Sequence, residues 1–133
     1  MARSRLILDS GAVSAISEGD ARALTWAKRA TERGMLIGVP APVFAETSTA
    51  HGLAATIHRA VRPKDTVLST TLDIAVEAGV MRYRTRKTHA TVDAIVVATA
   101  ARYPGSIILT SDLKDIITFA LERPDSRLTV RSV

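Results

Sequence analysis

The sequence predicts an α/β domain in which helices flank a short, mainly parallel sheet of four to five strands, in three layers. Short aliphatic runs alternate along the chain with longer segments of helical periodicity. Two of these runs, residues 6–8 and 107–109, are apolar at every position, as expected for strands buried on both faces. Each run leads to an acidic residue, Asp9 in the first case and Asp112 in the second. In open α/β sheets the ligand crevice lies outside the carboxyl ends of the strands.

Composition and length indicate a single domain over residues 1–133. Hydrophobic residues make up 47% of the chain and aromatic residues only 4%, so the core must be built from Ala, Val, Ile and Leu. The absence of cysteine excludes disulfides and thiolate metal sites and suits a reducing compartment. We find no signal peptide and no apolar run of about 18 residues, and therefore expect a cytoplasmic protein that does not enter the membrane.

In the first half of the chain, turn and capping residues separate the expected elements. Asp20 is a good N-cap for a helix that runs through Arg33 and stops at Gly34. Pro40 ends the second strand, and Pro42 fits the first turn of the helix after it. The expected strands cover residues 6–8, 35–39 and 66–68, and the expected helices cover residues 12–16, 20–33, 43–51 and 53–61.

In the second half, Thr70 and Asp73 have the spacing of a capping box and predict the start of a helix. The apolar stripe of this helix, which would normally face the core, consists of Leu72, Ala75, Val76, Gly79, Val80 and Tyr83. Thr91 is expected to cap the next helix, which is apolar nearly all round and should be buried. The remaining elements are helices over residues 92–102 and 112–121, and strands over residues 107–109 and 128–130, the last at an edge.

Four acidic residues are expected to gather at one edge of the sheet: Asp9, Glu46, Asp93 and Asp112. Two of them follow strands, and the other two lie near the starts of helices. Carboxylates this close repel one another unless a cation neutralises them. An all-oxygen ligand set suits Mg²⁺ or Mn²⁺. One or two such ions can bridge a phosphodiester, lower the pKa of a bound water and stabilise the leaving oxygen.

The rest of the chain is strongly basic. The whole chain carries 18 basic and 13 acidic residues, and without the four acids the balance is 18 to 9, or +9. A basic body around an acidic pocket suits an enzyme that cuts a polyanion. Four cations stand shortly before Asp93 and are candidates for RNA binding, although they would also suit a solvated helix end. They are Arg82, Arg84, Arg86 and Lys87.

At these residues the chain resembles the PIN-domain family and, in size and layout, the VapC-type toxins of bacterial toxin/antitoxin pairs. The resemblance covers essentially the whole chain. It rests on the aliphatic strand ending in Asp9, on Glu46 after Val-Phe-Ala, on Asp93 opening an Ala-rich helix, and on the strand that runs through Thr-Ser to Asp112. One departure lies after Asp9-Ser10, where many relatives have a bulky residue and this chain has Gly11.

The resemblance implies a PIN-like fold and a ribonuclease that depends on Mg²⁺ or Mn²⁺. The four acids would be catalytic and would hold the metal, Thr110 would support the site through its hydroxyl, and Asp115 would be an optional fifth acid. Family members commonly dimerise and are silenced by a cognate antitoxin. A homodimer and an antitoxin are therefore implied as partners, besides an RNA substrate.

Other interpretations compete with this one. Taken singly, each acid has a structural explanation, because a strand-end Asp caps a turn and acids suit helix starts. A phosphatase of the haloacid dehalogenase type needs a second Asp where Gly11 stands, and a receiver domain needs a further acidic pair and a Lys near the last strand. The sequence has no signature of a Ser or Cys nucleophile and no Gly-rich phosphate loop. The spacing of His51, His58 and His89 does not match a zinc site. The main alternative is a catalytically silent RNA-binding or antitoxin-binding module.

Overall fold

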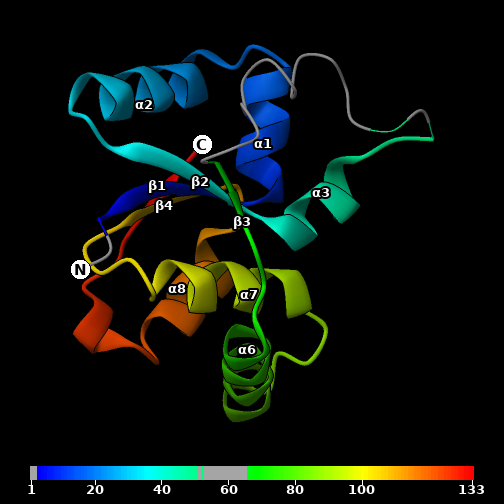
Figure 1. The fold of residues 1–133 in the computed structure, drawn as a ribbon. Coiled ribbons are helices and arrows are strands. Elements are labelled where there is room, and N and C mark those ends of the chain that lie inside the picture. Colours follow the sequence, from blue (N-terminus) through cyan, green and yellow to red (C-terminus); the bar gives the residue numbers. More distant parts are fainter. Residues whose placement is uncertain (1–2, 51, 53–65) are drawn as a thin grey trace.

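The computed structural model describes residues 3–50, 52 and 66–133 of the chain. In this part, five strands form one sheet in the order β3-β2-β1-β4-β5, and every neighbouring pair is parallel (Figure 1). The α/β class is therefore confirmed, with an all-parallel sheet of five strands. The strands are β1 (Arg5–Leu8), β2 (Leu36–Pro40), β3 (Val67–Leu68), β4 (Ile107–Thr110) and β5 (Thr129–Ser132).

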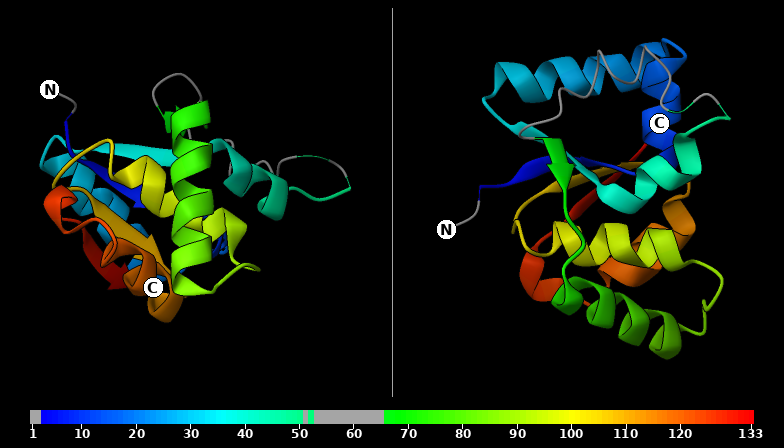
Figure 2. Two further views of the ribbon diagram at one scale, coloured as in Figure 1. Left: turned by 90° about the horizontal axis from the view of Figure 1, so that it is seen from below. Right: turned by 45° about the vertical axis from the view of Figure 1, so that its right-hand side comes forward.

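Helices cover both faces of the sheet and give the predicted three layers. Those in the described residues are α1 (Ser10–Ser17), α2 (Ala21–Glu32), α3 (Ala41–Thr47), α6 (Leu72–Thr85), α7 (Thr91–Ala100) and α8 (Leu113–Ala120). Helices α1 and α2 lie on one face, and α7 and α8 lie on the other, with α6 packed outside α7 (Figures 1 and 2). The helix predicted over residues 53–61 lies outside the described residues.

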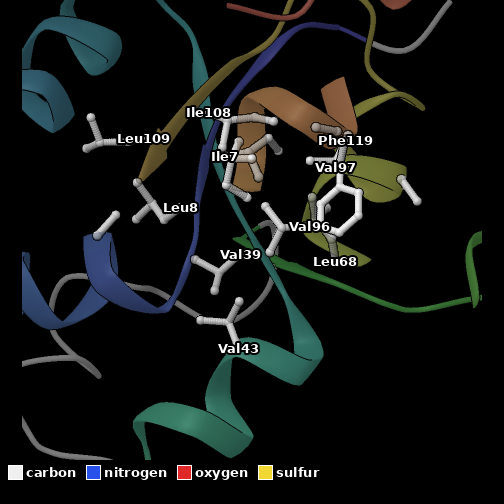
Figure 3. Packing of buried hydrophobic residues seen from close by; sticks show 14 of the residues in the cluster. Ile7, Leu8, Val39, Val43, Leu68, Val96, Val97, Ile108, Leu109 and Phe119 are labelled. Carbon is white, nitrogen blue, oxygen red and sulfur yellow. The ribbon is translucent and has the colours of Figure 1, made fainter. Parts of the chain in front are cut away.

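The core lies between the sheet and these helices (Figure 3). All three aliphatic residues after Arg5 in β1 are buried, which confirms that this central strand is covered on both faces. From Ala94 onward α7 is buried at nearly every position, as its all-round apolar sequence predicts. Phe119 of α8 completes this layer and is fully buried.

Two helix caps differ from the prediction by one residue. Helix α6 is capped by Thr71 rather than Thr70, because Thr71 is the last residue with an extended backbone and its side chain accepts a hydrogen bond from the Ile74 amide at 3.3 Å. Helix α7 starts at Thr91 itself and follows Ala90, so Thr91 is already helical and cannot act as the cap.

Three elements also begin or end at residues other than those predicted. Pro40 lies within β2 rather than after it, which is possible because it is the last residue of a short strand. Helix α3 begins at Ala41 and ends at Thr47, before the predicted end at residue 51. Strand β5 starts and ends later than predicted, but it does lie at an edge of the sheet.

The apolar stripe predicted for α6 does not face the core. The buried residues of this helix are Ile74, Ala78 and Met81, whereas the large side chains of the predicted stripe are exposed. The prediction was wrong because α6 is apolar on two sides, and the side with Ile74 and Met81 packs inward. Helical periodicity identifies such stripes but does not choose between them.

None of the described helices is both long enough and apolar enough to cross a membrane.

Candidate metal centre

The centre of the sheet brings two predicted site segments together. Strand β1 pairs with β2 on one side and with β4 on the other, and all three run in the same direction. The chain leaves β1 toward α1 and α2 on one face, and leaves β4 toward α8 on the other (Figure 1). The carboxyl ends of β1 and β4 therefore form a topological switch point, where ligand crevices occur in sheets of this type. Asp9 and Asp112 follow these two strands.

Asp9 is buried, with 3% of its surface exposed. Its Oδ1 accepts a hydrogen bond from the Ala12 amide at 2.8 Å and so caps α1. Its Oδ2 accepts a hydrogen bond from the hydroxyl of Thr110. Burial nevertheless raises the pKa of Asp9, because desolvation outweighs these two donors. Asp9 is thus a fixed carboxyl group whose negative charge lacks a full counter-charge.

Thr110 connects the two strand ends. Besides donating to Asp9, its Oγ1 accepts a hydrogen bond from the Asp112 amide at 2.8 Å. The Thr110 side chain is completely buried, so water does not compete for its hydroxyl. The hydroxyl holds the Asp9 carboxyl and the backbone of Asp112 in a fixed relation, which fits the supporting role expected for Thr110.

Three carboxylates converge beside this pair. Asp93, Asp112 and Asp115 each offer one oxygen, and these oxygens lie within 4.8 Å of one another. Asp93 lies in the first turn of α7, Asp112 caps α8, and Asp115 lies in the first turn of α8. The predicted optional acid Asp115 is therefore part of the closest group, in which Glu46 and Asp9 are not included.

Burial and the crowding of carboxylates raise the pKa of Asp93. Burial is the largest cause that raises it, followed by the negative charges of Asp9, Asp112, Asp115 and Glu46, and together they bring the pKa to about 7. Without a cation, Asp93 would be protonated in about half of the molecules at neutral pH. A positive ion among these oxygens would reverse that shift.

Glu46 lies at the exposed rim of the cluster. It comes from α3, and its Oε1 accepts a hydrogen bond from the hydroxyl of Ser10 at the start of α1. Its charge raises the pKa of Asp93 by a smaller amount than the other acids do. The structure thus gathers the four predicted acids around the same place, with Glu46 the most peripheral.

Lys87, which the sequence suggested as an RNA-binding residue, contributes a positive charge to the acidic cluster. Its Nζ lies 2.6 Å from Oδ1 of Asp115, and this ion pair lowers the pKa of Asp115. Lys87 directly follows Arg86, which ends α6 in a left-handed conformation (φ 58°). A lysine just past the end of a helix, within a charge run, gave no sequence signal for this role.

The other predicted RNA-binding cations divide into two kinds. Arg82 is held inside the connection between α6 and α7, where its Nε donates to the Thr88 carbonyl at 3.0 Å. Arg84 and Arg86 are exposed. Arg84 and Arg86 are therefore the members of the run that remain available to a ligand.

Gly11 is a further residue of the site that sequence reasoning did not explain. A Cβ at this position would lie 1.7 Å from the Oγ of Ser111 and 2.5 Å from its Cβ. The first turn of α1 therefore packs directly on the loop between β4 and α8, and no larger side chain fits. This close approach gives a physical reason for glycine where a bulky residue was expected.

The donor set fits a hard divalent cation. The converging ligands are carboxylate oxygens, which Mg²⁺ and Mn²⁺ prefer. In the described part of the chain, this acidic group is the one cluster of three or more potential metal ligands, and it includes no histidine. His51 and His58 lie outside the described residues, whereas His89 is exposed.

A scan of the chain against protein-family models gives no match, and a search of the curated proteins gives none either. The geometry of the acidic cluster therefore carries the functional argument.

Proposed function

We propose that the protein is a ribonuclease that uses Mg²⁺ or Mn²⁺ to hydrolyse RNA phosphodiester bonds, and that it is the toxin of a type II toxin/antitoxin pair. The observation that carries this proposal is the convergence of Asp93, Asp112 and Asp115 beside the buried Asp9, at the carboxyl edge of a parallel sheet. The resemblance to PIN domains supplies the reaction class.

Asp93 and Asp112 would hold the ion, with Asp9 beside them and Glu46 at the rim as the further predicted ligands. When bound, a divalent cation lowers the pKa of a coordinated water and stabilises charge on the phosphate oxygens. Asp93 must lose a proton to act as a ligand, because its pKa without the ion is about 7. Thr110 keeps Asp9 oriented while this happens. Asp115 forms an ion pair with Lys87. We therefore assign it as an additional acid of the site rather than as a primary metal ligand.

RNA is the proposed substrate because the body around the acidic cluster is basic. Arg84 and Arg86 are exposed close to the end of α6, the element that also leads to Lys87. Exposed arginines near the cluster would bind backbone phosphates and make affinity depend on salt. A double variant with Ala at both positions should bind RNA more weakly and with a shallower salt dependence. Unchanged affinity and salt dependence would exclude these two arginines from the RNA site.

A cognate antitoxin and a cytoplasmic location belong to the same proposal. The chain has no cysteine and a net charge of +5, which suits a reducing compartment and an acidic partner segment. Coexpression with the product of a neighbouring gene, followed by copurification, tests the partner. The expected complex should lack nuclease activity until the antitoxin is removed.

One observation favours the alternative of a catalytically silent RNA-binding or antitoxin-binding module. Asp9 and Asp112 both cap helices, so each has a structural role that does not require turnover. Asp93 is the acid that separates the two functions, because it lies within the first turn of α7 and caps nothing.

The deciding experiment is cleavage of a mixed RNA pool by purified protein freed of any antitoxin. We expect cutting with Mg²⁺ or Mn²⁺, and none with EDTA or with the Asp93→Asn variant. Glu122→Gln is the matched control, because Glu122 is an exposed carboxylate outside the cluster; it should cut normally. RNA binding without cutting in the presence of either metal would favour the silent module.

A further inference from the structure

Helix α2 and its C-cap carry three arginines and the single tryptophan of the chain along one side. Arg22, Trp26, Arg29 and Arg33 follow one another at spacings of four, three and four residues, and such spacings align side chains over about 17 Å of helix. This set is here called the α2 stripe. Its arginines are exposed, whereas Trp26 is half-buried and packs against the core.

The positive charge of the α2 stripe is not neutralised within the described residues. None of its arginines forms an ion pair there, not even with Glu32, the one acidic residue of α2. Arg29 and Arg33 suit the negative end of the helix dipole, but Arg22 lies in the first turn, where a cation is unfavourable. Helix stability therefore does not explain Arg22, whereas an anionic ligand would.

Trp26 gives the α2 stripe an aromatic contact surface. Its side chain borders two surface hollows, one shared with Arg22 and Arg29 and the other shared with Arg29 and Arg33. Packing against the core holds the ring in place, and its remaining surface is open to a ligand. A fixed indole among exposed guanidinium groups suits a ligand that joins flat aromatic rings to negative charges, as a nucleic acid strand does.

Arg3 extends the row of cations at the far end of α2. Its Nη2 donates a hydrogen bond to the Gly34 carbonyl at 3.2 Å, so its guanidinium lies next to the residue that follows Arg33. Arg3 is also exposed. Four arginines therefore follow the length of α2, and such a row suits a chain of phosphates better than it suits a single anion.

Helix α1 connects the α2 stripe to the metal centre. It begins directly after Asp9, is about 12 Å long and leads through a short turn into α2. Helix α2 then runs back along the same face of the sheet toward the start of β2 (Figure 1). Arg84 and Arg86 lie at the end of α6, which packs on the other face. A strand that passes the acidic cluster would thus meet cations on both sides of it.

We propose that the α2 stripe is a second binding site for the substrate and that it takes single-stranded RNA. The arginines bind successive phosphates, and one base stacks on Trp26. A base inside a duplex is already stacked between its neighbours and paired, so it cannot lie on the indole. This inference rests on the proposed nuclease function and adds which form of RNA is held beyond the bond that is cut.

Trp26 reports on its own site, because it is the only tryptophan of the chain. The full chain is titrated in EDTA, where metal-dependent cutting cannot occur, with an oligouridine of about 12 nucleotides. Binding is followed by tryptophan fluorescence and by the anisotropy of labelled RNA. The oligouridine should quench the fluorescence. A blunt RNA duplex of equal length, and polyphosphate, which has charges but no bases, should quench it less than half as much at saturation.

Arg29→Gln and Lys28→Gln compare two neighbouring cations of the same helix. Both residues are exposed, but successive residues of a helix point about 100° apart, so Lys28 lies off the stripe. Arg29→Gln should weaken oligouridine binding about threefold. It should also make the slope of log affinity against log salt shallower by about 0.7, because one phosphate contact is lost. Lys28→Gln is the matched control and should change neither quantity.

Trp26→Leu tests the stacked base and should weaken oligouridine binding at least about fivefold, with little change in the salt slope. Trp26→Phe keeps an aromatic face and should restore most of the affinity. Circular dichroism should show that both variants are folded. Anisotropy serves as the measurement here, because neither variant contains a tryptophan.

Oligouridine binding that leaves the fluorescence of Trp26 unchanged would overturn the inference. Equal losses in Arg29→Gln and Lys28→Gln would overturn it too, and so would equal quenching by the duplex. A protein that cuts RNA with Mn²⁺ but shows no quenching would keep the nuclease proposal and lose this site. Quenching by oligouridine in a protein that never cuts would keep the site and remove the nuclease, so the two failures are distinguishable.

Discussion

The hydroxyl of Thr110 donates a hydrogen bond to Oδ2 of Asp9, and this contact joins the carboxyl ends of the two central strands. The same hydroxyl oxygen accepts from the Asp112 amide. A single buried oxygen thus sets the position of one carboxyl group and of the backbone that carries another. Disturbing it should affect both acids at once.

Thr110→Val is nearly isosteric and removes the hydroxyl. It should leave the Asp112 amide without its acceptor and Asp9 without one donor, and lower the free energy of unfolding by about 1–3 kcal/mol. Mn²⁺ binding, measured by calorimetry, should weaken about tenfold because both acids lose their fixed orientation. Thr110→Ser keeps the hydroxyl and should bind Mn²⁺ nearly as well as wild type; equal loss in both variants would contradict the hydrogen-bond explanation.

Asp93 should make the metal-free protein less stable as the pH rises. Its pKa is about 7 in the folded chain and about 4 when unfolded, so the folded state holds the proton more tightly. The resulting stability is complete below about pH 4 and is lost as the pH rises through 7. Urea unfolding in EDTA should therefore give a free energy of unfolding lower at pH 8 than at pH 5, by on the order of 1–2 kcal/mol after solvent screening.

Asp93→Asn should remove most of this pH dependence. A smaller slope should remain, because burial also raises the pKa of Asp9. Mn²⁺ affinity of the wild type should increase over the same pH range, as Asp93 gives up its proton. A wild-type stability that increases steadily from pH 5 to 8 without metal would contradict the raised pKa.

Lys87→Gln should release Asp115 from its ion pair and leave the cluster more negative. We expect Mn²⁺ to bind about three- to tenfold more tightly in calorimetry, because the metal no longer competes with a resident ammonium group. Arg86→Gln removes a neighbouring cation that is exposed, and it should change Mn²⁺ affinity less than twofold. Equal effects of the two variants would indicate a general charge effect instead of the contact with Asp115.

Gly11→Ala should collide with Ser111 and displace the loop that leads to Asp112. The free energy of unfolding should drop by about 1–3 kcal/mol, and Mn²⁺ binding should weaken as well. Adding Ser111→Gly removes the atoms that the new methyl group meets, and should restore at least half of both losses. If the double variant behaves like Gly11→Ala alone, the close approach at Ser111 is not the reason for glycine.

The sheet and its acidic edge could be predicted because the signal is local. A strand buried on both faces needs apolar side chains at consecutive positions, so β1 and β4 are visible as aliphatic runs. The acids after them follow from the direction of parallel strands. Asp9 and Asp112 needed no knowledge of distant contacts.

The remaining features depend on contacts that a sequence does not display. Helix α6 has two apolar sides, and only the position of α7 decides which one is buried. The contact of Lys87 with Asp115 joins residues 28 positions apart, and Lys87 follows a left-handed residue, Arg86, that the sequence does not announce. The two adjacent threonines before α6 are equally suitable caps, and the start of the helix selects Thr71.

Asp9 and Asp112 both cap helices, so selection for stability alone would retain a capping residue at these positions, even without metal binding. A lineage that abandoned metal binding would still need a capping residue, such as Asp, Asn or Ser, where α1 and α8 begin. Position 93 has no such constraint, because α7 begins after Ala90 without a side-chain cap. Under the proposed function, replacement of Asp93 would therefore disable the metal centre while leaving the caps of both helices in place.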